Sequence, residues 1–107
     1  MKKITLILLT STSLTVSGFT LAGDDCQDPI NTWQPRETLQ LMLEKHGWQV
    51  DRIKVDDGCY EVKGTDTLGN RFEATYSPAT LHIRELDIKF KGQGSATQYL
   101  DRKNPLE

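Results

Sequence analysis

GWQVDRIKVDDGCYEV, residues 47–62, carries the strongest structural signal of the chain. Two runs of alternating apolar and polar residues flank Asp57-Gly58, a dipeptide that favours the two-residue turn of a β-hairpin. With this dipeptide at the tip, Lys54 faces Glu61 on one face of the hairpin, where opposite charges attract. The apolar cross-strand pairs share the other face: Val55 with Tyr60, and Ile53 with Val62. The stretch therefore predicts a hairpin with a fixed register and one buried face.

The residues just before this hairpin do not keep its alternation. Trp48 and Val50 are out of phase with Ile53 and Val55. A shift of one residue turns every side chain to the opposite face of a sheet, so an extra residue must be absorbed between the two pairs. We therefore expect a β-bulge or a late strand start near Asp51-Arg52.

The residues before Gly47 follow a helical period. Leu39, Met42, Leu43 and His46 have the spacing i, i+3, i+4 and i+7, which places them on one face of a helix. Pro35 suits the first helical position, and Gly47 suits the left-handed conformation that ends a helix. These signals predict an amphipathic helix over residues 35–46.

Further strands are expected after the hairpin. Apolar and polar side chains alternate in residues 70–76, and the loop before them contains Asp66 and Gly69 as turn residues. A second pair of alternating runs follows with opposite phases: Leu81 and Ile83 in the first, and Leu86, Ile88 and Phe90 in the second. Two interpretations stay open here, since residues 81–90 form either one bulged strand or two strands.

These elements predict an α+β fold, with one α-helix packed on one face of a three- to four-stranded antiparallel β-meander. The domain is expected to span residues 23–90, and the polar residues 91–107 are expected to form a flexible C-terminal tail. The expected core consists of Leu39, Met42, Leu43, Trp48, Ile53, Val55, Tyr60, Val62, Phe72, Ala74 and Tyr76. The other face of the sheet is expected to be polar, with Lys54, Glu61, Lys63, Arg71, Glu73 and Thr75.

Residues 1–22 have the pattern of a secretory signal peptide. Lys2 and Lys3 precede the apolar run ITLILL, and small and polar residues lead to a cleavage site after Ala22. The apolar run is too short, and the residues after it too rich in Ser and Thr, for a transmembrane anchor. We therefore expect a periplasmic or secreted protein with no stable membrane insertion after signal cleavage.

The charge of the chain argues against a polyanionic partner. Loss of residues 1–22 removes two lysines and no acidic residue, so the formal net charge changes from −2 to −4. A mildly acidic domain lacks the basic surface that binds nucleic acid or anionic lipid. The remaining chain of roughly 85 residues is long enough for only one modest core.

Cys26 and Cys59 are the only two cysteines, and both follow the predicted cleavage site. An even count in an exported chain indicates a disulfide. The bond would close a loop of about 30 residues, which contributes roughly 3–4 kcal/mol in the chain-entropy model. A redox or metal-binding pair is the alternative, although the spacing is not C-x-x-C and no cluster of His or Cys accompanies the two residues.

The chain lacks the motifs of common enzymes. His46 and His82 are its two histidines, and neither belongs to an H-E-x-x-H, G-x-S-x-G or phosphate-loop pattern. His46 is interpreted as a residue at the edge of the core, and His82 lies on the polar face of its strand. A metal site that joins the two is the alternative. We assign no catalytic, cofactor-binding or metal-binding residue, expect no cofactor, and predict that the chain is not an enzyme.

Residues 33–83 resemble the PepSY domain, and in particular its small stand-alone periplasmic form. Three features carry the resemblance: the helix exit Gly47-Trp48-x-Val50, the strand start Asp57-Gly58-Cys59-Tyr60-Glu61-Val62, and the turn from Asp66 to Gly69. The chain departs from the family at a later turn, where the family often has an Asp-Pro-x-Thr-Gly-like sequence. Here the turn reads SPATL, residues 77–81, so both the Asp and the Gly are absent.

The resemblance implies a function that is not enzymatic. PepSY domains occur in the propeptides of secreted metalloproteases and in cell-envelope proteins, and the family is thought to restrain protease activity. The favoured hypothesis is therefore an exported module that binds a protein partner, with a protease or envelope enzyme as the suggested partner. A periplasmic sensor or binding domain for a small ligand or metal, using His46 and His82, is the alternative. A redox protein that uses Cys26 and Cys59 is a third hypothesis.

Two sites are candidates for partner binding. Trp33 stands just before the predicted helix, and tryptophan is enriched in the hot spots of protein interfaces. The strand edge at Leu86, Ile88 and Phe90 offers a place for strand addition by a partner.

Overall fold

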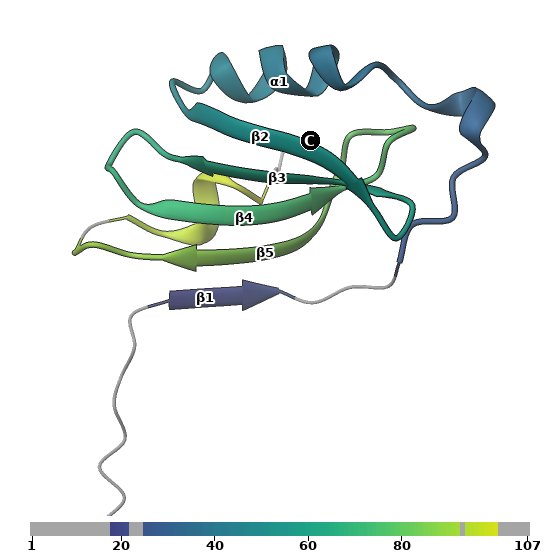
Figure 1. Ribbon diagram of the computed structural model, residues 1–107. Coiled ribbons are helices and arrows are strands. Elements are labelled where there is room, and N and C mark those ends of the chain that lie inside the picture. The colour runs from purple at the N-terminus through teal and green to yellow at the C-terminus, as the bar shows by residue number, and fades with distance from the viewer. Residues whose placement is uncertain (1–17, 22–24, 93, 101–107) are drawn as a thin grey trace, which may run out of the picture.

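The computed structural model describes residues 18–21, 25–92 and 94–100, and contains one α-helix and one antiparallel sheet. Figure 1 shows α1 (Arg36–Glu44) with the strands in the order β1-β5-β4-β3-β2. The strands are β1 (Gly18–Leu21), β2 (Gln49–Asp56), β3 (Cys59–Thr65), β4 (Arg71–Tyr76) and β5 (Ile83–Lys89), and two 3-10 turns are η1 (Ile30–Thr32) and η2 (Ala96–Gln98). The α+β class with an antiparallel sheet is confirmed, but the sheet has five strands rather than three or four.

The additional strand comes from the segment that the sequence assigns to the signal peptide. β1 lies on the outer side of β5, where its four residues extend the meander by one edge strand. The rest of the predicted signal peptide lies outside the described residues. Among the described helices, none combines the length and the apolar character needed to cross a membrane.

The hairpin of β2 and β3 has the predicted register. Lys54 pairs with Glu61, and the apolar pairs follow on both sides of them as expected. Asp57 and Gly58 have φ angles of 51° and 77°, as the two-residue turn requires. The register shifts between Val50 and Arg52, which confirms the bulge predicted there.

β5 is one strand with an irregular pairing, which decides between the two interpretations of residues 81–90. Thr75 pairs with Glu85, but its neighbour Tyr76 pairs with Ile83. The extra residue on β5 reconciles the two opposite phases of the sequence. Ile83 and Leu86 both contribute to the core as a result.

The helix is shorter than the sequence predicts. Pro35 is the N-cap residue and has extended backbone angles, so the helix begins at Arg36. It ends at Glu44, and Gly47 follows with a φ of 85°. The left-handed position is therefore as expected, while His46 lies beyond the helix rather than on its last turn.

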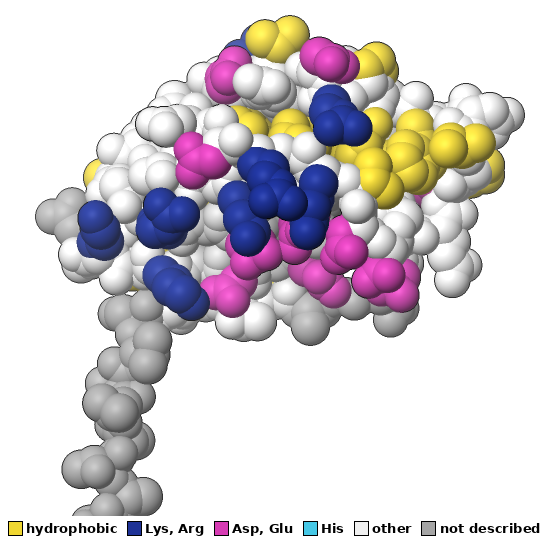
Figure 2. Space-filling view, in the orientation of Figure 1, with side chains coloured by type: hydrophobic (Ala, Val, Ile, Leu, Met, Phe, Trp, Pro, Cys, Tyr) yellow, Lys and Arg dark blue, Asp and Glu magenta, His cyan; other side chains and the backbone are white. Residues whose placement is uncertain are grey.

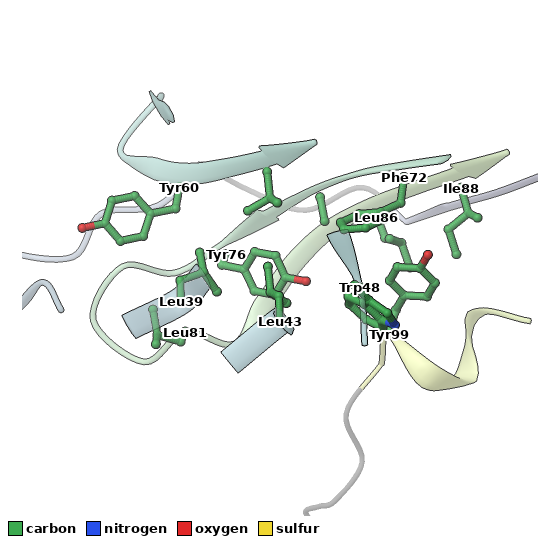
Figure 3. Close-up of a cluster of buried hydrophobic side chains, with 12 residues drawn as sticks. Leu39, Leu43, Trp48, Tyr60, Phe72, Tyr76, Leu81, Leu86, Ile88 and Tyr99 are labelled. Atoms are coloured by element: carbon green, nitrogen blue, oxygen red, sulfur yellow. The ribbon is translucent and has the colours of Figure 1, made fainter. Parts of the chain in front are cut away.

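The core lies between α1 and one face of the sheet, as Figure 3 shows. Most of the expected residues are buried there, but Met42 and Ile53 are half-buried and Val55 is 46% exposed. Val55 was expected in the core and is the clear exception, because it lies near the tip of the hairpin on the edge strand β2.

The C-terminal part of the described chain also differs from the flexible tail predicted for residues 91–107. Tyr99 is only 4% exposed and packs against the rings of Trp48 and Phe72. Its ring centroid lies 4.5 Å from that of Trp48. Residues 101–107 lie outside the described part of the chain.

The face of the sheet opposite the helix is polar, as expected. Lys54 and Glu61 form an ion pair with a distance of 3.3 Å between nitrogen and oxygen, and Lys63 lies 4.0 Å from Glu73. Thr75 is the exception among the expected polar residues, since it is buried. Figure 2 shows basic and acidic side chains gathered in adjoining patches on this side of the molecule.

The hairpin turn gives a first prediction. A Cβ atom at Gly58 would collide with the backbone oxygen of Cys26, whereas a Cβ at Gly69 would meet no atom within 4 Å. Both glycines have positive φ, so Gly69→Ala should cost about 1–2 kcal/mol from backbone strain alone. Gly58→Ala should cost a further ~1–3 kcal/mol, because the backbone must move. Urea unfolding of both variants measures the difference, and equal losses would contradict the close approach of Cys26.

Candidate functional site

Trp33, the first predicted binding residue, is half-buried at the start of the helix. Its indole nitrogen donates a hydrogen bond to the backbone oxygen of Asp28 at 3.0 Å. Its ring meets the ring of Tyr60 edge-on, with centroids 5.6 Å apart. Tyr60 pairs across the hairpin with the exposed Val55. Trp33 is therefore held in place beside an apolar surface, which suits a contact residue.

The second predicted site is an edge of main chain rather than a patch of side chains. Leu86 and Ile88 are 1% and 0% exposed, so their side chains belong to the core and cannot touch a partner. Phe90 follows β5 and is half-buried. Trp33 contacts Tyr60, which pairs with the last residue of β4. Phe90 follows Lys89, which pairs with the first residue of β4, so the structure does not bring Trp33 and Phe90 together.

The two edges of the sheet are protected differently. At the β2 edge, the guanidinium of Arg36 on α1 donates a hydrogen bond to the backbone oxygen of Ile53 at 3.1 Å. The outer side of β5 is covered instead by β1, which pairs only with its last four residues. An uncovered edge offers unpaired main-chain donors and acceptors to another strand.

His46 and His82 line one cavity of about 590 Å³ between the end of the helix, the turn before β5 and the C-terminal segment. Its remaining walls are mostly apolar or aromatic: Met42, Leu43, Trp48, Tyr76, Thr80, Leu81, Ile83, Gln98, Tyr99 and Leu100. A volume of this size is typical of pockets for small organic ligands. The sequence paired the two histidines as a hypothesis but gave no sign that the C-terminal segment forms a wall.

Both imidazoles of this cavity are exposed, and the ring of His46 lies 4.8 Å from that of Trp48. The search for metal ligands, which covers the described residues only, finds no group of three or more His, Cys, Asp or Glu side chains that would hold a metal ion.

Asp66 is the centre of a buried hydrogen-bond network. Its carboxylate accepts bonds from the backbone nitrogens of Leu68 and Asn70, both at 2.9 Å, and from the hydroxyl of Tyr99 at 2.7 Å. The predicted role as a turn former is confirmed. The network also fixes the C-terminal segment, which the sequence did not indicate. The one available signal is the spacing of Ala96, Tyr99 and Leu100, which fits one helical turn.

These contacts set the pKa of Asp66. Burial alone would raise the pKa, but the hydrogen bonds from Tyr99, Asn70 and Leu68 favour the charged carboxylate and lower it below the usual value. Burial and the bond to Asp66 raise the pKa of the Tyr99 hydroxyl, so this group stays protonated as a donor.

The polar face carries a pair of interacting carboxyl groups. A hydrogen bond with Glu61 raises the pKa of Glu73, and burial and the charge of Glu61 act in the same direction. Lys54 lies beside Glu61 and favours the charged form of that residue. A shallow hollow of about 260 Å³ adjoins the pair and is also lined by Thr20, Glu85 and Asp87. This acidic side of β5 favours basic or polar neighbours.

Cys26 and Cys59 form the predicted disulfide. Both residues are buried, with 6% and 4% of their surface exposed. The bond ties the segment before α1 to the start of β3. Reactive cysteine pairs are normally accessible, so this burial favours a structural bond over the redox hypothesis.

The Asp66 network predicts a dependence of stability on pH. Because the pKa of Asp66 is lowered in the folded state, its contribution is present above the ordinary pKa of 3.8 and is lost as the pH falls through the folded value. Asp66→Asn should therefore cost about 1–3 kcal/mol at pH 7 and clearly less at pH 2. Urea unfolding of wild type and Asp66→Asn at the two pH values measures this difference in the free energy of unfolding.

Tyr99→Phe is the matched control for this experiment. It keeps the aromatic ring in the core and removes only the hydroxyl that donates to Asp66. Tyr99→Phe should lower the free energy of unfolding by less than Asp66→Asn does. This loss should also be smaller at pH 2 than at pH 7. A gap between wild type and Asp66→Asn that is the same at both pH values would contradict the role of the charged carboxylate.

Comparison with protein families finds a match to the PepSY model described as "Peptidase propeptide and YPEB domain", over residues 6–86. Comparison with curated proteins finds no match. The search of solved structures also finds none. The family match covers most of the chain, and it includes the helix and the hairpin described above. The chain therefore belongs to the PepSY family of peptidase propeptide and YPEB domains.

Proposed function

We propose that the chain is an exported, non-enzymatic module that binds a protein in the cell envelope and restrains a protease. Membership of a family described by peptidase propeptides is the observation that carries this proposal. A propeptide domain acts by contact with its protease, so the expected chemistry is recognition rather than catalysis.

The described residues fit such a role. The half-buried Trp33 contacts Tyr60, whose cross-strand partner near the hairpin tip is the exposed Val55. β1 pairs with the outer side of β5, and cleavage after Ala22 would remove it and leave the main-chain groups of β5 to an extended partner segment. The two sites lie at different ends of the sheet, so a partner that touches both would have to follow the molecule along its length.

The proposed location rests on two observations. The disulfide between Cys26 and Cys59 requires an oxidising compartment to form and persist. Residues 1–22 have the composition of a cleavable signal peptide. We therefore place the mature chain in the periplasm or outside the cell.

The proposal predicts a captured and inhibited protease. The processed chain, coupled to beads through its C-terminus, is mixed with periplasmic extract, and bound proteins are identified by mass spectrometry. A captured protease should hydrolyse a fluorescent protein substrate more slowly as free processed chain is added. Trp33→Ala should weaken the inhibition by tenfold or more, because removal of a buried tryptophan from an interface commonly costs over 1.4 kcal/mol.

Ile30→Ala is the matched control. Ile30 is 76% exposed and lies in the same entry segment, but it has no aromatic ring and so cannot make a ring contact like that of Trp33 with Tyr60. This variant should inhibit like wild type. A protein that is captured equally well by a reduced, alkylated and unfolded bait is counted as non-specific. If no protease is captured by the folded bait and none is inhibited, the proposal fails.

The cavity supports a second candidate function, the binding of a small organic ligand. It joins two exposed imidazoles to apolar and aromatic walls in a volume of about 590 Å³. Imidazoles at the rim would bind an acidic group or the metal of a cofactor such as haem, while the walls would hold an apolar body.

This second function predicts measurable heat on titration with haem. Zinc, copper and calcium serve as probes for a metal alone. His46→Ala and His82→Ala should each weaken the binding by at least tenfold, and Lys89→Ala, which lies away from the cavity, should leave it unchanged. If isothermal titration detects no heat with any of the four probes at micromolar concentrations, ligand binding by this cavity is contradicted.

A further inference from the structure

β1 shows what the outer edge of β5 accepts. Four consecutive pairs join the two strands: Gly18 with Lys89, Phe19 with Ile88, Thr20 with Asp87, and Leu21 with Leu86. The pairing is antiparallel and continues the meander, so the edge is a regular strand acceptor. The register of β1 covers the last four residues of β5, from Leu86 to Lys89.

The two faces of β1 meet different surroundings. Phe19 packs against the core beside Ile88, so the edge accepts a bulky apolar side chain at this position. Thr20 lies on the other face, opposite Asp87 and beside the acidic hollow. A Cβ at Gly18 would lie 3.0 Å from the backbone oxygen of Ile88, so this position favours the smallest residue. The edge therefore has a definite side-chain preference.

β1 is not essential to the core. The buried cluster is built from residues between Leu39 and Tyr99, and Phe19 contributes only as a partly buried neighbour. The disulfide also begins after β1, at Cys26. A chain that begins at residue 23 thus keeps the core, the hairpin and the disulfide. Cleavage after Ala22 would remove β1 and leave the edge of β5 without it.

We propose that the edge of β5 is a strand-binding site, which Gly18–Leu21 occupies until signal cleavage and which an extended segment of a partner protein occupies afterwards. The segment has a small residue opposite Lys89, a bulky apolar residue opposite Ile88 and a basic or polar residue opposite Asp87. This inference rests on the proposed function only in taking the partner to be a protein. In the precursor, the chain's own strand blocks the site until export is complete.

The other edge is a poorer acceptor. On β2, the backbone oxygen of Ile53 already accepts from Arg36. A bulge between Val50 and Arg52 interrupts the regular spacing of the strand. Bulges and covering side chains are common protections of sheet edges against strand addition. The β5 edge holds a strand over Leu86–Lys89 with no shift of register.

The test uses a fluorescent peptide with the sequence of residues 16–22, VSGFTLA, and the processed chain 23–107 with its disulfide intact. Fluorescence anisotropy should show saturable binding, and hydrogen exchange should show protection that is gained in β5 rather than in β2. The unprocessed chain should bind the peptide roughly tenfold more weakly, because its own β1 competes at a millimolar effective concentration.

The same substitution on the two faces of the peptide provides the control. Phe19→Lys puts a charge against the apolar core and should weaken binding by tenfold or more. Thr20→Lys puts the same charge opposite Asp87 and should strengthen binding about two- to fivefold at low salt. These opposite effects on affinity distinguish a peptide that pairs with β5 in register from an apolar peptide that adheres non-specifically.

Three results of the peptide experiment would overturn the proposal. They are an absence of saturable binding up to millimolar peptide, equal effects of the two lysine substitutions, or protection confined to β2. Dimerisation of the processed chain through β5, measured by analytical ultracentrifugation and reversed by the peptide, would replace the partner with a second copy and also contradict it. If the peptide binds but no protease is inhibited, the strand-binding site on β5 is supported and the proposed function is contradicted. The two proposals can therefore fail separately.

Discussion

The hydroxyl of Tyr99 donates a hydrogen bond to the buried carboxylate of Asp66, and this contact ties the C-terminal segment to the loop before β4. Figure 1 shows α1 running along β2, so the helix covers a width of only about 10–12 Å, whereas five paired strands are about 19 Å wide. The helix alone cannot cover that face. Trp48, Phe72 and Tyr99 cover the part beyond it with ring centroids 4.5 to 5.3 Å apart, and Figure 3 shows Trp48 and Tyr99 side by side. The Asp66 network holds the last of these rings in place.

This arrangement makes the two sides of the sheet unequal. The helix and the disulfide-linked entry segment lie towards β2 and β3, where Arg36 bonds to the β2 edge and Cys26 is joined to Cys59. On the other side, beyond β4, the sheet ends in β5 and a strand of only four residues. The buried cluster lies between Leu39 and Tyr99, so we infer that the β5 edge can exchange its occupant at little cost to the fold. A small domain with one helix thus has one protected edge and one adaptable edge.

Local patterns in the sequence predicted the parts of the fold that local forces determine. The register of the hairpin follows from Asp57-Gly58 and two alternating runs, and the bulge after Val50 follows from a break in phase. The position of Tyr99 depends on a partner 33 residues earlier in the chain, and no local pattern encodes such a contact. β1 was missed for a related reason. Its four residues pair with β5, far along the chain, and their composition is equally typical of the end of a signal peptide.

The candidate site was less predictable than the fold because its chemistry belongs largely to the main chain. The side chains of Leu86 and Ile88 are in the core, and their backbone pairs with β1 on the outer side of β5. A strand that binds another strand needs hydrogen-bonding groups that every residue carries, so it requires no motif. Selectivity then comes from the neighbours, here the apolar surface around Ile88 on one face and Asp87 on the other. A binding module of this kind can therefore be well adapted to a partner while its sequence shows only the pattern of a stable sheet.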